Sequence, residues 1–86
     1  MYKLELVKSL EKDFRKIADE KHEILFNAIE KLSTEPFPAN SFKKIKGKDD
    51  CYRLRVGNYR ILYRVSVSTK TITAYRVGHR QNIYKG

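Results

Sequence analysis

The spacing of apolar residues in the first half of the chain predicts one strand followed by two helices. Residues 2–7 alternate apolar and polar positions, as a strand with one buried face does. Residues 9–18 carry apolar side chains at i, i+4 and i+7, and residues 20–34 carry a longer stripe with helical spacing. The residues expected to face the core are Tyr2, Leu4, Leu6, Leu10, Phe14, Ile17, Ile24, Leu25, Ala28, Ile29 and Leu32.

Polar residues and prolines mark where these two helices begin and end. Asp19 is the expected N-cap between them, because a short acidic side chain accepts hydrogen bonds from unpaired backbone N–H groups. Glu20 and Glu23 suit the positive end of the second helix. Pro36 and Pro38 end it, since proline cannot continue a helix. The first half therefore predicts a strand and a helical hairpin.

The second half changes to a period of two and is rich in Tyr, Val, Ile, Thr and Arg. Residues 51–65 and 71–79 are predicted strands, and residues 47–50 a turn. Residues 41–45 fit either a strand or an extended basic loop. The expected fold is α+β: an N-terminal strand, a helical hairpin, then an antiparallel sheet of three to four strands with the helices packed on one face. At this length, residues 1–86 form one domain.

A two-residue turn at Gly57–Asn58, of the II′ or I′ type, fixes the register of the central hairpin. The predicted cross-strand pairs are Val56–Tyr59, Arg55–Arg60, Leu54–Ile61, Arg53–Leu62 and Tyr52–Tyr63. Opposite residues share a face, so one face is apolar and ready to cover the helices. The other face is expected to carry Arg53, Arg55, Arg60, Leu62 and Arg64.

The net charge of +9 lies entirely in the second half of the chain. Residues 1–40 hold seven Lys or Arg and eight Asp or Glu, whereas residues 41–86 hold twelve and two. Placing Arg55 opposite Arg60 is destabilising by up to about 1 kcal/mol. This pattern favours an anion site, most simply for phosphates. The alternative is that the arginines extend into solvent or pair with acidic residues of the helices.

Neighbouring residues on the last strand extend this candidate site. Arg76, His79 and Arg80 are expected at the same edge as the hairpin arginines. Tyr75 and Tyr84 offer aromatic surface on which nucleobases could stack.

Several classes of protein are excluded by composition. No apolar run approaches the roughly 18 residues of a membrane-spanning helix, and the alternating N-terminus does not resemble a signal peptide. Cys51 alone forms no internal disulfide, and with His22 and His79 it makes no zinc site. We therefore expect a cytoplasmic protein without a metal or cofactor.

Metal-dependent nuclease chemistry needs clustered carboxylates, and the basic second half of the chain has too few acidic residues to provide them. That half holds only the adjacent pair Asp49 and Asp50, whose position is more typical of a solvated turn than of a metal site. Metal-free phosphoryl transfer remains, in which arginines stabilise the extra charge on phosphorus. In RNA the nucleophile can then be the 2′-OH of the substrate.

The sequence YRLRVGNYRILY at residues 52–63, followed by VGHR at 77–80 and by Tyr84, resembles the RelE/ParE superfamily of toxin–antitoxin toxins, on the RelE side. The upstream order also fits, including the basic stretch at residues 43–47. The resemblance covers essentially the whole chain as a single RelE-like domain. Its pattern is fairly specific for the superfamily and less specific for activity.

The resemblance implies an activity and a set of site residues. RelE-type toxins cut messenger RNA in the ribosomal A site by attack of the substrate 2′-OH, without a metal. Arg60 and Arg80 match two arginines that stabilise the scissile phosphate. Arg53 and Arg55 fall where relatives carry lysines; arginine essentially never deprotonates, so they can stabilise charge only. Proton abstraction then falls to Tyr84, near the place of a family tyrosine, or to His79.

The leading hypothesis is a ribosome-dependent mRNA endoribonuclease that acts as the toxin of a toxin–antitoxin pair. Its expected partners are the ribosome, mRNA and a cognate antitoxin with an acidic or amphipathic segment. The alternatives are a ParE-like inhibitor of DNA gyrase and a non-catalytic or attenuated homologue that binds RNA or the ribosome. The residues expected to bind RNA or the ribosome are Lys43, Lys44, Lys46, Lys48, Arg64 and Arg76.

Overall fold

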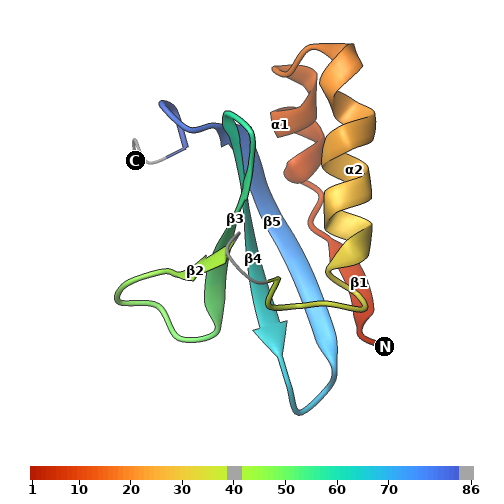
Figure 1. Ribbon diagram of the computed structural model, residues 1–86, viewed down its shortest axis with the longest axis vertical. Coiled ribbons are helices and arrows are strands. Elements are labelled where there is room, and N and C mark those ends of the chain that lie inside the picture. The colour runs from red at the N-terminus through yellow and green to blue at the C-terminus, as the bar shows by residue number, and fades with distance from the viewer. Residues whose placement is uncertain (39–41, 84–86) are drawn as a thin grey trace.

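Two helices cover one face of a five-stranded sheet in the computed structural model, which describes residues 1–38 and 42–83 (Figure 1). The elements in chain order are β1 (Lys3–Leu6), α1 (Leu10–Arg15), the 3-10 turn η1 (Asp19–Lys21), α2 (His22–Lys31), β2 (Phe42–Lys44), β3 (Cys51–Val56), β4 (Tyr59–Ser66) and β5 (Thr71–His79). The expected α+β architecture is confirmed. Residues 41–45 were expected to form either a strand or an extended loop, and residues 42–44 form a strand. No helix among the described residues is long and apolar enough to cross a membrane.

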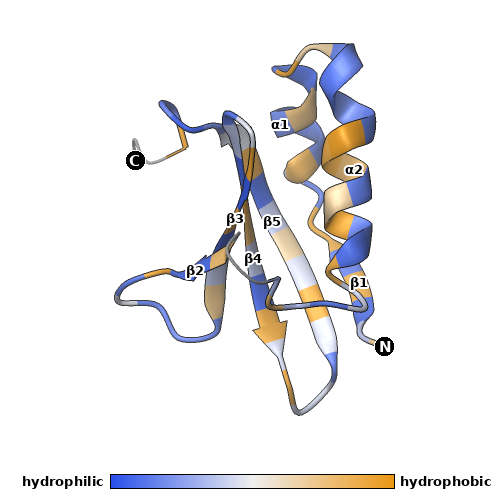
Figure 2. Ribbon diagram, viewed as in Figure 1, coloured by the Kyte–Doolittle hydropathy of each residue, from blue (hydrophilic) through white to orange (hydrophobic). Residues whose placement is uncertain are grey.

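The strands follow the order β1-β5-β4-β3-β2. Strands β2 to β5 are antiparallel, as expected from their short connections. The N-terminal strand joins the same sheet at its far edge, where β1 pairs with β5 in parallel. The chain between β1 and β5 contains both helices and strands β2 to β4, which provides the long connection that this parallel pairing requires. Figure 2 shows the alternation of apolar and polar residues along β4 and β5 that leaves one face of the sheet for the helices.

The central hairpin has the expected register. All five predicted pairs occur, from Val56 opposite Tyr59 to Tyr52 opposite Tyr63. Gly57 has a φ of 59°, while Asn58 keeps a negative φ, which is the signature of a type II′ turn. Glycine is suited to the first position because it has no Cβ to clash at positive φ.

The junction between the helices differs from the prediction that Asp19 is an N-cap. Asp19 is the first residue of η1, and the residue that precedes α2 is Lys21, which makes no side-chain cap hydrogen bond. The ring Nε2 of His22 instead donates to the carbonyl oxygens of Phe14 and Ile17, at 2.7 and 2.9 Å. This hydrogen bonding ties the end of α1 to the start of α2, so the chain turns without an acidic cap.

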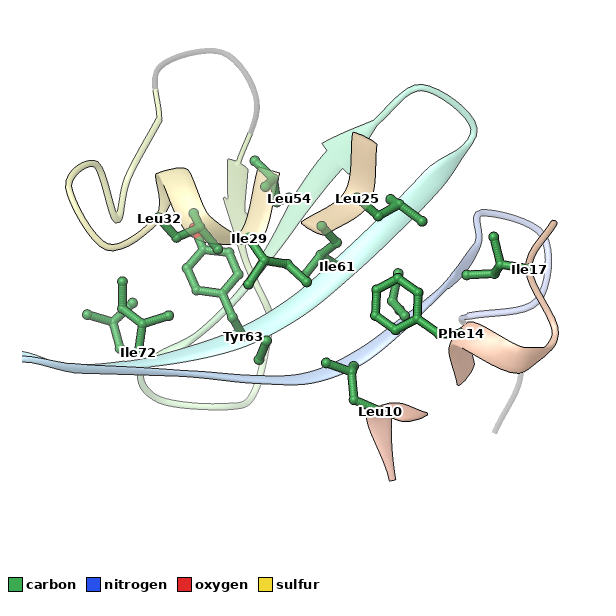
Figure 3. Close-up of a cluster of buried hydrophobic side chains, with 13 residues drawn as sticks. Leu10, Phe14, Ile17, Leu25, Ile29, Leu32, Leu54, Ile61, Tyr63 and Ile72 are labelled. Carbon is green, nitrogen blue, oxygen red and sulfur yellow. The ribbon is translucent and has the colours of Figure 1, made fainter. Parts of the chain in front are cut away.

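The hydrophobic core fills the space between the helices and the sheet. Figure 3 shows Leu25 and Ile29 of α2, and Leu32 directly after it, meeting the buried side chains of β4. Two expected core residues are not in it: Ile24 is 54% exposed and Leu6 is 48% exposed. Ile24 lies at the margin of the helical stripe, and Leu6 is the last residue of the edge strand β1.

One acidic side chain links the helix layer to the end of β5. Strand β1 ends at Leu6, opposite Ala74, so the edge of β5 beyond that point has no neighbouring strand. A carboxylate oxygen of Asp13, on α1, accepts a hydrogen bond from the backbone N–H of Val77 at 3.0 Å. The end of β5 is therefore held in place by a helix rather than by a strand.

Candidate functional site

The sheet face that points away from the helices carries a cluster of arginines. Leu54 and Ile61 are buried against the helices, so their neighbours on β3 and β4 point the other way. Arg55 lies directly opposite Arg60 in the register, as expected. We call this surface the arginine face; its residues on the central hairpin are Arg53, Arg55, Arg60, Leu62 and Arg64.

A β-bulge in β5 adds two consecutive residues to the arginine face. Ala74 pairs with Tyr63 and Arg76 pairs with Leu62, which leaves Tyr75 as an extra residue between them. Ala74 and Val77 are both buried in the core, so Tyr75 and Arg76 both point away from the helices. If β5 kept all of its residues but had no bulge, strict alternation would direct the side chain of Arg76 into the core.

The same bulge moves His79 away from the site, and the expectation that it joins the arginines is wrong. After the bulge, Val77 and His79 both take the helix side of the sheet. His79 pairs with Tyr59, and the two rings meet edge to face with centroids 5.6 Å apart. Its Nδ1 accepts a hydrogen bond from the backbone N–H of Gln81 at 3.2 Å.

The hairpin turn brings the two predicted phosphate-binding arginines close together in the backbone. The N–H of Arg80 donates to the carbonyl of Asn58 at 2.8 Å. Arg60 lies just beyond that turn, and its guanidinium donates to the carbonyl oxygens of Gly57 and Tyr59 at 3.0 and 2.9 Å. Arg55, Arg60 and Arg80 therefore gather at one end of the sheet, around the Gly57–Asn58 turn.

The charge of this end is not balanced by neighbouring acids. Lys3 pairs with Glu5 and Arg15 pairs with Glu11, and both ion pairs lie in the acidic first half of the chain. No carboxylate in the described part of the chain pairs with Arg55, Arg60 or Arg80. The acidic residues of the helices lie across the sheet, so the alternative of helix–arginine pairing is not what these three residues do.

The basic stretch before β3 contributes to the arginine face only in part. Lys43 pairs with Arg53 in the register and so shares its face, whereas Lys44 pairs with Tyr52 and takes the helix side. Lys46 and Lys48 are exposed in the connection between β2 and β3. Of this basic set, Lys43 is the residue that the sheet adds directly to the arginine face.

A residue missed by the sequence reasoning, Ile83, also lies on the arginine face. After β5 the chain turns to the side of the sheet away from the helices (Figure 1), where the N–H of Ile83 donates to the carbonyl of His79 at 3.0 Å. A Cβ on Gly78 would lie 3.5 Å from Ile83 Cδ1, so Ile83 packs over this glycine, which pairs with Arg60. Ile83 is buried, and it directly precedes Tyr84, which is outside the described residues.

The tyrosine that does lie on the arginine face is a poor base. Burial, and then the neighbouring Cys51 thiol, raise the pKa of Tyr75 to about 12, although the positive charge of Arg64 opposes the shift. The hydroxyl oxygen of Tyr75 is buried without a hydrogen-bond partner of good geometry. Tyr75 is therefore neutral at physiological pH and does not accept a proton there.

Comparison with known proteins gives similarity over almost the whole chain. A family model described as the ParE toxin of the type II toxin–antitoxin system parDE matches residues 3–84. RelE1 of Methanocaldococcus jannaschii is 30% identical over 86 residues, which is 98% of this chain and 96% of that protein.

Two solved structures share the fold. The archaeal RelE–RelB complex from Pyrococcus horikoshii OT3 contains a chain that is 25% identical, with a TM-score of 0.79, covering 94% of this chain and 97% of its own. The RelB–RelE antitoxin–toxin complex from Methanococcus jannaschii contains one that is 33% identical, with a TM-score of 0.75, covering 93% and 94%.

Proposed function

Because the chain belongs to the RelE/ParE superfamily of toxins of type II toxin–antitoxin systems, we propose that it cuts messenger RNA on the ribosome. The chain is a RelE-like toxin; the proposal concerns its target and chemistry. The observation that carries it is the gathering of Arg55, Arg60 and Arg80 at one end of the sheet with no described carboxylate paired to them. A surface of this kind suits a phosphate whose negative charge increases during reaction.

The proposed reaction is an internal transfer on the RNA itself. The 2′-OH of one nucleotide attacks the adjacent phosphorus and loses its proton, and the bond from phosphorus to the 5′-oxygen of the next nucleotide breaks. The products are a 2′,3′-cyclic phosphate and a 5′-hydroxyl, which takes up a proton. Arg60 and Arg80 stabilise the charge that builds on the phosphoryl oxygens, with Arg53 and Arg55 as further positive charges.

The proton acceptor in this proposal is Tyr84. Two other candidates are disfavoured: His79 lies on the helix side of the sheet, and the pKa of Tyr75 is raised by burial. Ile83, the residue before Tyr84, is seated on the arginine face. An ionisable tyrosine there would be favoured in its charged form by the surrounding arginines.

We further propose a cognate antitoxin as the protein partner, in the cytoplasm. The relatives from Pyrococcus horikoshii and Methanococcus jannaschii were both solved as complexes of RelE with RelB. A segment with acidic residues would neutralise the arginine face of this chain, because that face carries the positive excess of the sequence.

Primer extension on an mRNA in a purified translation system, with and without ribosomes, tests the nuclease. We expect discrete cuts that require ribosomes and that fall by about 10²–10³-fold in Arg80→Ala, the loss typical for removal of one group that stabilises a transition-state oxyanion. The matched control is Arg15→Ala, which removes an exposed arginine on α1, across the sheet. Full cleavage by Arg80→Ala would reject the site, and no cleavage while translation continues would reject the nuclease.

A second candidate function is inhibition of DNA gyrase, because the family model that matches residues 3–84 is that of the ParE toxin. A gyrase supercoiling assay tests it, and cells would then stop DNA replication before protein synthesis. A non-catalytic homologue would instead show salt-dependent RNA binding without cleavage.

A further inference from the structure

The arginine face has an apolar floor that phosphate binding alone does not require. Cys51 and Ile83 are 3% and 4% exposed, yet neither belongs to the core between helices and sheet. Leu62 and Tyr75 are half-buried on the same face. We define the apolar floor as Cys51, Leu62, Tyr75 and Ile83. Arginines border it on β3, β4 and β5.

Tyr75 lies across the sheet in this floor. Its hydroxyl is buried next to Cys51, which is on β3, whereas Tyr75 itself is on β5. Strand β4 separates the two, so the distance to be bridged is roughly 10 Å, twice the spacing between strands. The Tyr75 side chain must therefore cross over β4 on the arginine face, and the residue as a whole is only half-buried. Because the hydroxyl is buried, the exposed part of the side chain is not its polar tip.

We propose that Tyr75 is a stacking platform for one unpaired nucleobase of single-stranded RNA, next to the phosphates that the arginines hold. The inference rests on the proposed function and names a base-binding site within it. An aromatic face bordered by cationic side chains is the composition of single-strand binding grooves, where stacking tolerates any base. The buried hydroxyl fits this mode, since it leaves no hydrogen-bonding group to read the base. The bulge in β5 is what brings the ring to this face.

Equilibrium binding of a short single-stranded RNA at low salt tests the platform, together with a set of RNAs that each carry one abasic position. For the wild type we expect one abasic position to weaken binding roughly 5- to 100-fold, the usual effect of losing one stacked base. Tyr75→Leu, which keeps an apolar side chain and removes the ring, should weaken binding of the intact RNA by a similar factor. Its binding should then be insensitive to that same abasic position.

Two matched variants isolate the ring from other effects. Tyr75→Phe keeps the ring and removes the buried hydroxyl, so it should bind as the wild type does. Phe26→Leu removes an exposed aromatic ring from α2, on the helix side, and should also leave binding unchanged. Arg60→Ala should weaken binding to every RNA, abasic or not, because it acts on phosphate.

The outcomes separate the platform from the proposed function. If Tyr75→Leu stays as sensitive to the abasic position as the wild type, no base stacks on Tyr75. If Arg60→Ala weakens binding while no abasic position does, the RNA is held through its phosphates only. That result would reject the stacking platform and leave the proposed function intact. Absence of any RNA binding would overturn the platform, whereas the ribosome-dependent cleavage assay decides the proposed function separately. If Tyr75→Leu weakens binding of an antitoxin peptide but not of RNA, the floor serves a protein partner and the platform is wrong.

A measurement on the wild type covers the case in which Tyr75→Leu does not fold. RNA with 5-iodouridine at successive positions is irradiated with the protein, and the cross-linked peptide is identified by mass spectrometry. A cross-link at Tyr75 from one position supports the platform. Cross-links confined to other peptides overturn it.

Discussion

The two faces of the central hairpin are built from the same residues in alternation, and they obey different physical demands. On the helix side, Ile61 and Tyr63 are fully buried. The buried residues around them are apolar, and no charged side chain is buried with them among the described residues. On the arginine face, Arg55 lies against Arg60, an arrangement that opposes stability. The comparison teaches that one face is shaped by folding, while the other retains an unfavourable pairing that folding does not explain.

Exchanging adjacent residues for alanine should give opposite phenotypes on the two faces. Ile61→Ala should lower the free energy of unfolding by about 2–5 kcal/mol, because it empties a fully buried site. Arg60→Ala should change it by no more than about 1 kcal/mol and reduce cleavage by about 10²–10³-fold. Urea denaturation and the ribosome-dependent cleavage assay measure the two quantities. Equal losses of stability in the two variants would remove the distinction between the faces.

The packing of Ile83 over Gly78 is an apolar contact on the arginine face. It therefore tests whether an apolar contact on this face supports activity rather than folding. A Cβ at position 78 would lie in ordinary contact with Ile83, at 3.5 Å, so Gly78→Ala should behave as the wild type. Gly78→Val needs more room and should displace Ile83 and the chain that follows it. We expect cleavage to fall roughly 10- to 100-fold, as a displaced catalytic group does.

Because Ile83 is outside the main core, the melting temperature of Gly78→Val should change much less than that of Ile61→Ala. Cleavage by Gly78→Val at the level of Gly78→Ala would mean that this contact does not position the site.

The smallest effect concerns the alkaline stability of the arginine face. The pKa of Tyr75 is raised to about 12 by burial, whereas the unfolded chain loses that proton near pH 10. Between those values the unfolded state binds fewer protons than the folded state, so stability should fall as pH rises. Tyr75→Phe should make this fall less steep, as measured by urea denaturation across that range. Burial also raises the pKa of Tyr63, so some slope should remain. An unchanged slope would show that the Tyr75 hydroxyl is not buried in solution.

Local sequence signals predicted the central hairpin and most of the core. The Gly57–Asn58 turn fixes the register within a few residues, and the helical stripe located Leu25 and Ile29. The parallel pairing of β1 with β5 was not predicted, because it joins segments about 70 residues apart and leaves no local pattern. The junction at Asp19 was wrong because a tertiary hydrogen bond from His22 fixes the chain there instead.

For the site, the sequence identified the hairpin arginines but misplaced one residue and missed another. His79 was expected with the arginines because it lies near Arg76 and Arg80 at the end of the same strand. The bulge at Tyr75 instead leaves His79 on the helix side of the sheet. The residue types around position 75 do not predict a β-bulge there. Ile83 was missed because a single apolar residue in a polar stretch carries no periodicity. The assignment of Tyr84 stays a prediction, since it lies outside the described residues.

The bulge in β5 also bears on how long this strand needs to be. Without Tyr75, Ala74 and Arg76 would be adjacent, and plain alternation would leave each on the face it already has. The strand could thus be one residue shorter and still present the same core and the same arginines. Length variation at this point would be neutral for the scaffold, in contrast to a deletion between Val77 and Arg80, which would turn Arg80 to the other face. What the additional residue contributes is an aromatic ring among cations.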